Sequence, residues 1–144
     1  MLSYTDRAAN AARFAHVLRT HGIVVGERMF LLSGRVPELY AATLGAMKAG
    51  VVVSPLFAAF GPEPVRARME IGQASVLVTT EAQYRRKVAD WRAGMPGLKL
   101  VLIIGDTAPE GCVALGPAMA AAPTTFETVT TMPDNTPPAT KTRT

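Results

Sequence analysis

This chain of 144 residues has little cysteine, few aromatic side chains and no long hydrophobic run. Its one cysteine, Cys112, cannot form a disulfide within the chain, so we expect a reducing, cytoplasmic setting. No apolar run reaches the roughly 18 residues that a membrane-spanning helix requires. These absences exclude a disulfide-stabilised scaffold and leave no candidate transmembrane segment.

The charge of the chain is moderately basic, with a formal net charge of +4. Such a balance suits nucleic acid, an anionic membrane or small molecules that carry phosphate. The basic residues are scattered except for Arg85, Arg86 and Lys87, and aromatic residues do not alternate with them as they do in single-strand binders. We therefore predict no nucleic-acid partner and no membrane partner.

Short apolar segments alternate with segments of helical periodicity along most of the chain. Helices are expected over residues 4–21, 37–50, 62–71 and 81–93, and strands over residues 29–32, 51–53, 76–78 and 100–104. This alternation predicts an α/β fold, with a parallel sheet of about four strands and helices on both faces.

Three local expectations follow from the same pattern, two on packing and one on a helix start. On the third helix, Val65, Met69 and Ile71 are expected to contact the core. The strand at residues 51–53 is a continuous β-branched run, which is typical of a strand covered on both faces. Thr79 or Thr80 is a suitable N-cap for the fourth helix.

The composition changes after Gly105, where Thr and Pro become frequent. We expect a weak strand or turn around residues 113–115. Beyond it, the Thr/Pro-rich segment cannot bury enough apolar surface to offset the entropy of ordering it. The sequence thus divides into a folded part at residues 1–122 and an irregular or disordered tail at residues 123–144.

No catalytic constellation can be identified from the residues alone. His16 and His21 lie on the first helix without a further ligand at metal-binding spacing, so we predict no metal site. Cys112 has no basic cluster beside it in the sequence and is interpreted as an inert thiol. Glu63 and Glu81 lie near helix starts, where the helix dipole accounts for them without acid–base chemistry.

One candidate ligand-binding segment joins a strand to a helix and contains two aromatic and two small residues: Phe57, Ala58, Ala59 and Phe60. In a parallel sheet such a connection lies at the carboxyl edge, where ligands usually bind. The alternative is a well-packed turn whose phenylalanines join the core. Neither G-x-x-x-x-G-K-[ST] nor G-x-G-x-x-G occurs in the chain.

The second candidate is the basic cluster of Arg85, Arg86 and Lys87, which follows Tyr84 on the fourth helix. Three adjacent cations cannot all face one way on a helix. Two of them together with Tyr84 could hold a phosphate group. The alternative is a solvated basic face.

Five segments, in this order, resemble the N-terminal region of AMP-forming acyl-CoA synthetases, within the adenylate-forming ligase superfamily. They are GERMFLL at 26–32, RVPELY at 35–40, LGAMKAG at 44–50, SPLF at 54–57 and VLVTT at 76–80. The segment PLFAAFGPEPV at 55–65 resembles the acetyl-CoA synthetase branch in particular. The resemblance covers about residues 3–104, which would make residues 1–122 a partial N-terminal subdomain of such a ligase.

The resemblance implies a reaction in which a carboxylate and ATP form an acyl-adenylate and pyrophosphate, and CoA then accepts the acyl group. It also implies CoA, ATP and Mg²⁺ as cofactors of the full-length family. Phe57 to Phe60 would lie near the path of the CoA pantetheine arm, with Ala58 and Ala59 where family members tend to hold a glycine pair. Arg85, Arg86 and Lys87 would face the CoA phosphates, which guanidinium groups suit.

Several elements of the family are absent from the 144 residues. They are the phosphate loop of the form S-G-T-T-G-x-P-K-G, the Y-G-x-T-E-type motif, the ribose-binding Asp, the hinge and the C-terminal domain with its catalytic lysine. We therefore expect no activity from the isolated chain and no tight cofactor binding by it. Alternatively, the chain is a non-catalytic module that pairs with the remainder of a ligase made as a separate chain, or a truncated remnant.

Overall fold

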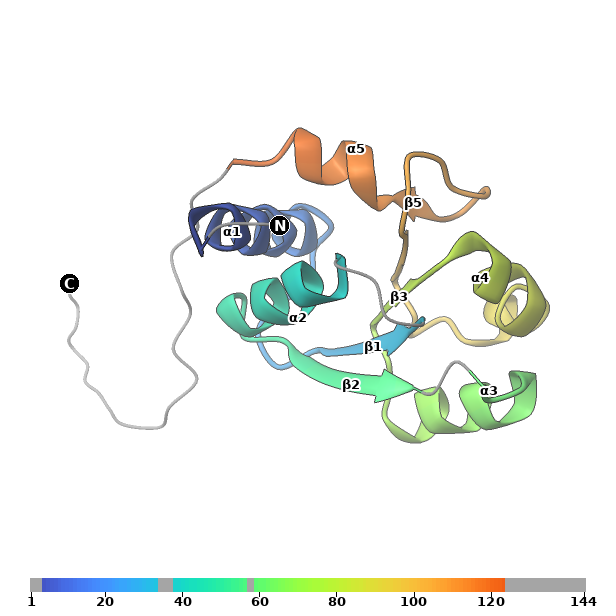
Figure 1. Ribbon diagram of the computed structural model, residues 1–144. Coiled ribbons are helices and arrows are strands. Elements are labelled where there is room, and N and C mark those ends of the chain that lie inside the picture. The colour runs from blue at the N-terminus through green and yellow to red at the C-terminus, as the bar shows by residue number, and fades with distance from the viewer. Residues whose placement is uncertain (1–3, 34–37, 57–58, 124–144) are drawn as a thin grey trace, which may run out of the picture.

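The computed structural model describes residues 4–33, 38–56 and 59–123 (Figure 1). In this part of the chain, five parallel strands form one sheet in the order β2-β1-β3-β4-β5. The strands are β1 (Arg28–Leu32), β2 (Val52–Leu56), β3 (Val76–Thr79), β4 (Leu100–Ile103) and β5 (Val113–Ala114). The helices are α1 (Tyr4–Thr20), α2 (Glu38–Lys48), α3 (Pro62–Ile71), α4 (Glu81–Lys87), α5 (Leu115–Ala120) and the 3-10 helix η1 (Arg92–Gly94). The predicted α/β class with a parallel sheet is confirmed.

Helices cover both faces of the sheet, and the alternation of side chains along each strand decides which face receives which residue. In β1, Met29 and Leu31 join the cluster that contains α1, α2 and α5 residues, whereas Phe30 and Leu32 join the α3 and α4 cluster. Each apolar strand therefore contributes side chains to the cores on both faces of the sheet, as is typical of a buried parallel sheet. Figure 1 shows α1, α2 and α5 on one side of the strands and α3 with α4 on the other.

The first core depends on a close approach of α1 and α2. A Cβ atom at Gly45 would lie 2.6 Å from the carbonyl oxygen of Ala11 and 2.7 Å from the Cβ of Phe14. Neighbouring α2 positions that face the interior are also small, Ala42 and Ala46 among them. Small residues on one side of α2 thus let the two helix backbones pack nearly in contact.

Local signals account for several helix boundaries. Pro62 occupies the first turn of α3, where its missing N–H breaks no helical hydrogen bond. Thr80 is the N-cap of α4, and its side-chain oxygen accepts from the Gln83 N–H at 3.3 Å. Gly50 follows α2 with φ of +77°, a conformation that glycine adopts without steric cost.

Two packing expectations are wrong. Val52 is 51% exposed because β2 is the outermost strand of the sheet rather than one covered on both faces. Ile71 is 84% exposed because it lies about 200° around α3 from Met69, which with Val65 forms the buried side of that helix.

The end of the folded part also differs in detail from the expectation. α4 ends at Lys87 rather than near residue 93, and η1 continues the connection to β4. The expected strand near residue 113 is present as β5, but the helix α5 that follows it was not predicted. The expected irregular tail falls almost entirely at residues 124–144, outside the described residues.

Candidate functional site

The carboxyl ends of the strands, where ligands usually bind in such sheets, meet at one edge. Thr79 is fully buried there, and its hydroxyl donates to the carbonyl oxygen of Leu32 at 2.6 Å, which joins the ends of β3 and β1. The Gly116 N–H donates to the carbonyl oxygen of Gly105 at 2.8 Å and holds the start of α5 against the end of β4. At the described part of this edge, these two hydrogen bonds join β3 to β1 and α5 to the end of β4.

The predicted segment Phe57 to Phe60 follows β2 at this edge. Phe57 and Ala58 lie outside the described residues. Ala59 is exposed, whereas Phe60 is half-buried and packs against the α3 and α4 core. The guanidinium of Arg68, on α3, lies 4.6 Å from the centre of the Phe60 ring, a cation–π contact. The Phe60 ring therefore packs partly against the core, as the alternative of a well-packed turn predicts.

The predicted basic cluster occupies the last turn of α4. Arg85 forms an ion pair with Glu81, one turn earlier, at 2.8 Å. The Nε of Arg86 donates to the carbonyl oxygen of Ala82 at 3.4 Å, and both arginines are exposed. Burial, and secondly the charge of Arg86, lower the pKa of Lys87. The cluster therefore contains two outward arginines and a lysine that is half-buried.

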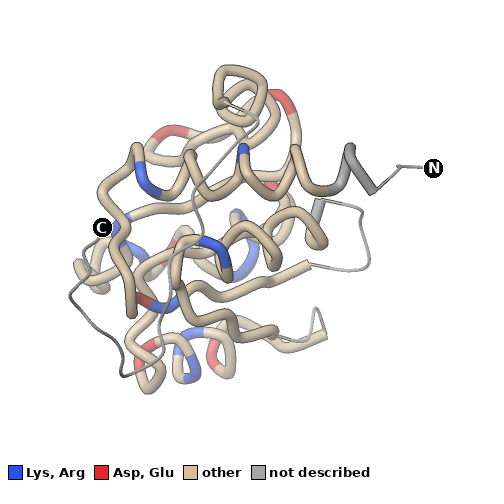
Figure 2. The backbone as a smooth tube through the Cα atoms, turned by 90° about the vertical axis from the view of Figure 1, so that its left-hand side faces the viewer, with Lys and Arg blue, Asp and Glu red and all other residues tan. Residues whose placement is uncertain are grey.

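Tyr84 is not a partner of this cluster, so the predicted grouping of two cations with Tyr84 is corrected. The ring is only 6% exposed, and its hydroxyl accepts from the Arg92 guanidinium at 3.2 Å. Around α4, Tyr84 lies about 100° from Arg85 and about 200° from Arg86, so the tyrosine faces the core while both arginines face solvent. Figure 2 shows Lys and Arg distributed over several elements rather than gathered in one patch.

The two predicted sites are carried by different elements. Phe60 lies between β2 and α3, whereas the cluster lies about 10 Å along α4 from its N-cap Thr80. α4 directly follows β3, so it begins at the carboxyl edge (Figure 1). The structure thus places Phe60 in the connection between β2 and α3 and the basic cluster in the last turn of α4.

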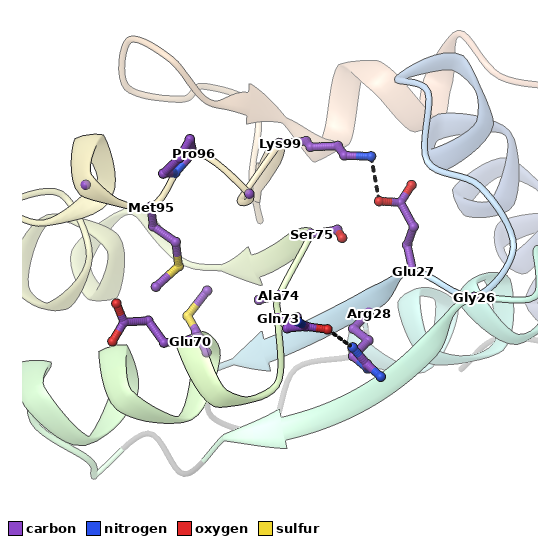
Figure 3. A pocket seen from close by; sticks show the side chains of 13 residues that line it. Gly26, Glu27, Arg28, Glu70, Gln73, Ala74, Ser75, Met95, Pro96 and Lys99 are labelled. Carbon is purple, nitrogen blue, oxygen red and sulfur yellow. Dashed lines mark hydrogen bonds and ion pairs between the residues drawn. The ribbon is translucent and has the colours of Figure 1, made fainter.

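A groove of about 630 Å³ lies at the opposite, amino end of the strands (Figure 3). The Lys99 ammonium and the Glu27 carboxylate form an ion pair there at 2.6 Å, and Arg28 donates to Gln73 at 2.8 Å. These pairs join residues far apart in the sequence, and no local pattern predicts them. Gln73 has φ of +53°, which turns the chain sharply between α3 and β3.

The Glu27 carboxylate is held by several donors. Burial alone raises its pKa, but hydrogen bonds from Lys99, from the Val24 N–H and from Ser75, together with the Lys99 charge, outweigh burial, so the pKa is lowered. The Val24 N–H lies 2.8 Å from the carboxylate. Glu27 therefore stays ionised and joins the starts of β1, β3 and β4.

The comparisons with known proteins identify the family. A sequence profile of the AMP-binding enzyme family matches residues 1–140. The chain belongs to the AMP-binding enzyme family. It is 36% identical over 110 residues to the acetyl-coenzyme A synthetase of Bacillus subtilis (strain 168), covering 76% of the chain and 19% of that protein. It is 31% identical over 114 residues to the acetyl-coenzyme A synthetase of Mycolicibacterium smegmatis, covering 74% of the chain and 12% of that protein.

Solved structures of AMP-binding enzymes show the same fold. The Brucella canis acyl-CoA synthetase matches with a TM-score of 0.77 and 34% identity, over 89% of this chain and 23% of that one. The benzoate CoA ligase of Burkholderia xenovorans LB400 matches with a TM-score of 0.79 over 93% of this chain and 26% of that one; its 23% identity supports the fold alone. The resemblance to AMP-forming acyl-CoA synthetases is confirmed, and the chain spans a fifth or less of the length of these curated relatives.

One further contact in this AMP-binding family member could not be predicted from the sequence. Arg92 approaches the half-buried Cys112 at 3.5 Å between Nη1 and Sγ, and also donates to the Gly111 carbonyl oxygen. The residues are twenty positions apart, so no local pattern signals the contact. Arg92 thereby fastens the loop before β5 to the α4 region. Among the described residues, no group of three or more His, Cys, Asp or Glu could hold a metal ion, and no helix could span a membrane.

Proposed function

We propose that this chain supplies the N-terminal part of an AMP-forming acetate- or acyl-CoA ligase. In that reaction a carboxylate and ATP give an acyl-adenylate and pyrophosphate, and CoA then displaces AMP. The observation that carries the proposal is the 36% identity to the acetyl-coenzyme A synthetase of Bacillus subtilis, joined to a matching fold at 34% identity. Because the chain spans only 19% of that synthetase, the reaction belongs to the complete ligase.

Within such a ligase, the chain contributes contacts to CoA. The segment Phe57, Ala58, Ala59 and Phe60, which follows β2 in the sequence, lines the path of the pantetheine arm, with Phe60 contributing the exposed part of its half-buried ring. Arg85, Arg86 and Lys87 face the CoA phosphates. The exposure of both arginines supports this role, since an exposed guanidinium can present two N–H donors to phosphate oxygens.

The isolated chain does not form an adenylate. Its 144 residues contain no S-G-T-T-G-x-P-K-G sequence, so nothing in them orients the ATP phosphates and Mg²⁺ during the reaction. CoA, ATP and Mg²⁺ are cofactors of the complete ligase, and the chain alone binds none of them tightly. A reducing, cytoplasmic location agrees with the single cysteine.

Acetate-dependent ATP–pyrophosphate exchange tests this assignment. The isolated chain is expected to show no exchange above the blank, whereas the Bacillus subtilis synthetase serves as the positive control. A hybrid ligase, in which the matching 110 residues of that synthetase are replaced by the corresponding residues of this chain, is expected to regain exchange. An exchanging isolated chain would contradict its proposed inactivity, and a folded hybrid without exchange would contradict the ligase assignment.

The CoA contacts are tested in the same hybrid ligase. Arg85→Ala together with Arg86→Ala is expected to raise the KM for CoA about fivefold and leave the KM for ATP unchanged, because an exposed charge pair contributes about 1 kcal/mol. Arg66→Ala removes an exposed cation from α3 and serves as the matched control. Equal effects of both changes on CoA would exclude a specific role for the cluster.

The alternative function is a non-catalytic module that pairs with the remainder of a ligase made as a separate chain. It is favoured by the apolar side chains that α2 exposes, such as Tyr40 and Met47. Co-purification of the chain with a separately encoded ligase body would favour this alternative over a covalently continuous enzyme.

A further inference from the structure

Arg68 is an exposed residue of α3 that has no carboxylate neighbour along its helix. The residues three and four positions away are Pro64, Val65, Ile71 and Gly72. Arg66, on the same helix, pairs with Glu70 four residues later at 3.8 Å. Within the residues that the structure describes, the Arg68 guanidinium forms no ion pair.

The Arg68 guanidinium instead lies 4.6 Å from the centre of the Phe60 ring. Phe60 directly precedes Gly61, the N-cap of α3. Side chains of a helix lean toward its N-terminus, which lets an arginine about two turns into α3 reach back to this ring. The ring also packs against the core of α3 and α4 residues. Phe60 is therefore held both by apolar packing and by a cation.

The start of α3 has no capping side chain that could hold Phe60 in place. The N-cap Gly61 makes no side-chain hydrogen bond to the first turn, and a Cβ at this position would meet nothing within 4 Å. The orientation of the Phe60 side chain therefore depends on the contacts of its ring. Arg68 provides one of these contacts from the solvent side, since its own side chain is exposed.

We propose that Arg68 is a positioning residue for CoA, because its guanidinium fixes the Phe60 ring beside the path of the pantetheine arm. This inference rests on the proposed function, in which Phe60 borders that path. Arg68 acts through the ring and does not touch CoA. A cation over an exposed aromatic ring contributes little free energy, so Arg68 tunes the affinity for CoA and is not required for the reaction.

Steady-state kinetics of the hybrid ligase test this role. Arg68→Ala is expected to raise the KM for CoA about threefold and to leave the KM for ATP unchanged, as loss of an exposed cation–π contact predicts. Arg68→Lys retains a cation and is expected to restore most of the affinity, whereas Arg68→Met retains only an apolar stem and is not. Arg66→Ala is the matched control, since its guanidinium pairs with Glu70, and is expected to leave the KM for CoA unchanged.

A double-mutant cycle with Phe60→Leu shows whether Arg68 acts through the ring. In a Phe60→Leu hybrid, Arg68→Ala is expected to have no further effect on the KM for CoA. An effect of the same size in both backgrounds would show that Arg68 acts on CoA directly and would overturn the inference. An unchanged KM for CoA in the Arg68→Ala hybrid, or a change equal to that of Arg66→Ala, would overturn it as well.

ATP–pyrophosphate exchange separates this inference from the proposed function, because formation of the adenylate does not involve CoA. A hybrid that exchanges, but whose KM for CoA does not respond to Arg68→Ala, excludes the positioning role and leaves the ligase assignment standing.

The contact itself can be tested in the unmodified 144-residue chain, without the hybrid. Arg68→Ala is expected to lower the urea midpoint of this chain more than that of its Phe60→Leu variant, because the second protein has no aromatic ring for the cation to contact. Equal shifts of the midpoint in both backgrounds would show that the cation and the ring are not coupled and would overturn the inference.

Discussion

The two faces of the sheet are packed by different means. On the face covered by α1 and α2, small residues bring main chain against main chain, with Gly45 facing the Ala11 carbonyl. On the face covered by α3 and α4, larger and more adaptable side chains such as Met69, Tyr84 and Met95 fill the space. The same parallel sheet therefore has one face that accepts no added volume and one that can adjust. This difference predicts that equal substitutions have unequal effects.

The largest expected effect follows from adding one methyl group to the first face. Gly45→Ala would place a Cβ 2.6 Å from the Ala11 carbonyl oxygen, which belongs to a helix backbone and cannot move aside. We expect the free energy of unfolding to fall by about 2 kcal/mol, since overpacking costs exceed the better helix propensity of alanine. Urea unfolding measures the change.

Gly94→Ala is the control for that experiment, because nothing lies within 4 Å of a Cβ at Gly94. It is expected to change the free energy of unfolding by less than about 0.5 kcal/mol. Similar losses for Gly45→Ala and Gly94→Ala would refute the close approach of α1 and α2.

A smaller effect is expected on the second face. A Cβ at Gly72 would meet the tip of the Phe30 ring, and rotation of that side chain can relieve the contact. Gly72→Ala is expected to cost about 1 kcal/mol, and Phe30→Leu in the same chain should remove part of that penalty. A loss for Gly72→Ala as large as that for Gly45→Ala would remove the distinction between the two faces.

The smallest effect concerns the Glu27–Lys99 ion pair in the groove at the amino ends of the strands. The pKa of Glu27 is lowered from its ordinary value of 4.5, so its stabilising contribution is present above that value and is lost as the pH falls through the folded-state pKa. Between about pH 6 and about pH 3, the urea midpoint of the unmodified chain should fall more than that of Glu27→Gln. Lys99→Met should reduce this pH dependence, and parallel pH profiles for all three proteins would contradict the role of the ion pair.

Much of the fold could be predicted from local patterns. The apolar run at residues 76–78 lies in β3, and Thr80 caps α4 as its side chain and position suggest. The outcome for α3 was mixed, since Val65 and Met69 are buried and Ile71 is exposed. The helical period accounts for this outcome, because Val65 and Met69 are four residues apart and share a side, whereas Ile71 lies about 200° around the helix from Met69.

The candidate site was less predictable. The sequence identified an arginine-rich turn but grouped Tyr84 with it, whereas the fold turns Tyr84 into the core and pairs it with Arg92. The Glu27–Lys99 pair and the approach of Arg92 to Cys112 could not be predicted, because their partners meet only after the strands assemble.

The alternation of the first four strands and four α-helices, the parallel sheet and the family resemblance could be predicted from the sequence itself, since periodicity, turn residues and family motifs are local properties of the chain. Strand order, the exposure of Val52 at the sheet edge and the exposure of Tyr40 and Met47 on α2 were decided only by the tertiary structure. The physical reason is that burial depends on which neighbours are present, and an apolar side chain gives no sign in the sequence of whether its partner lies within these 144 residues or beyond them.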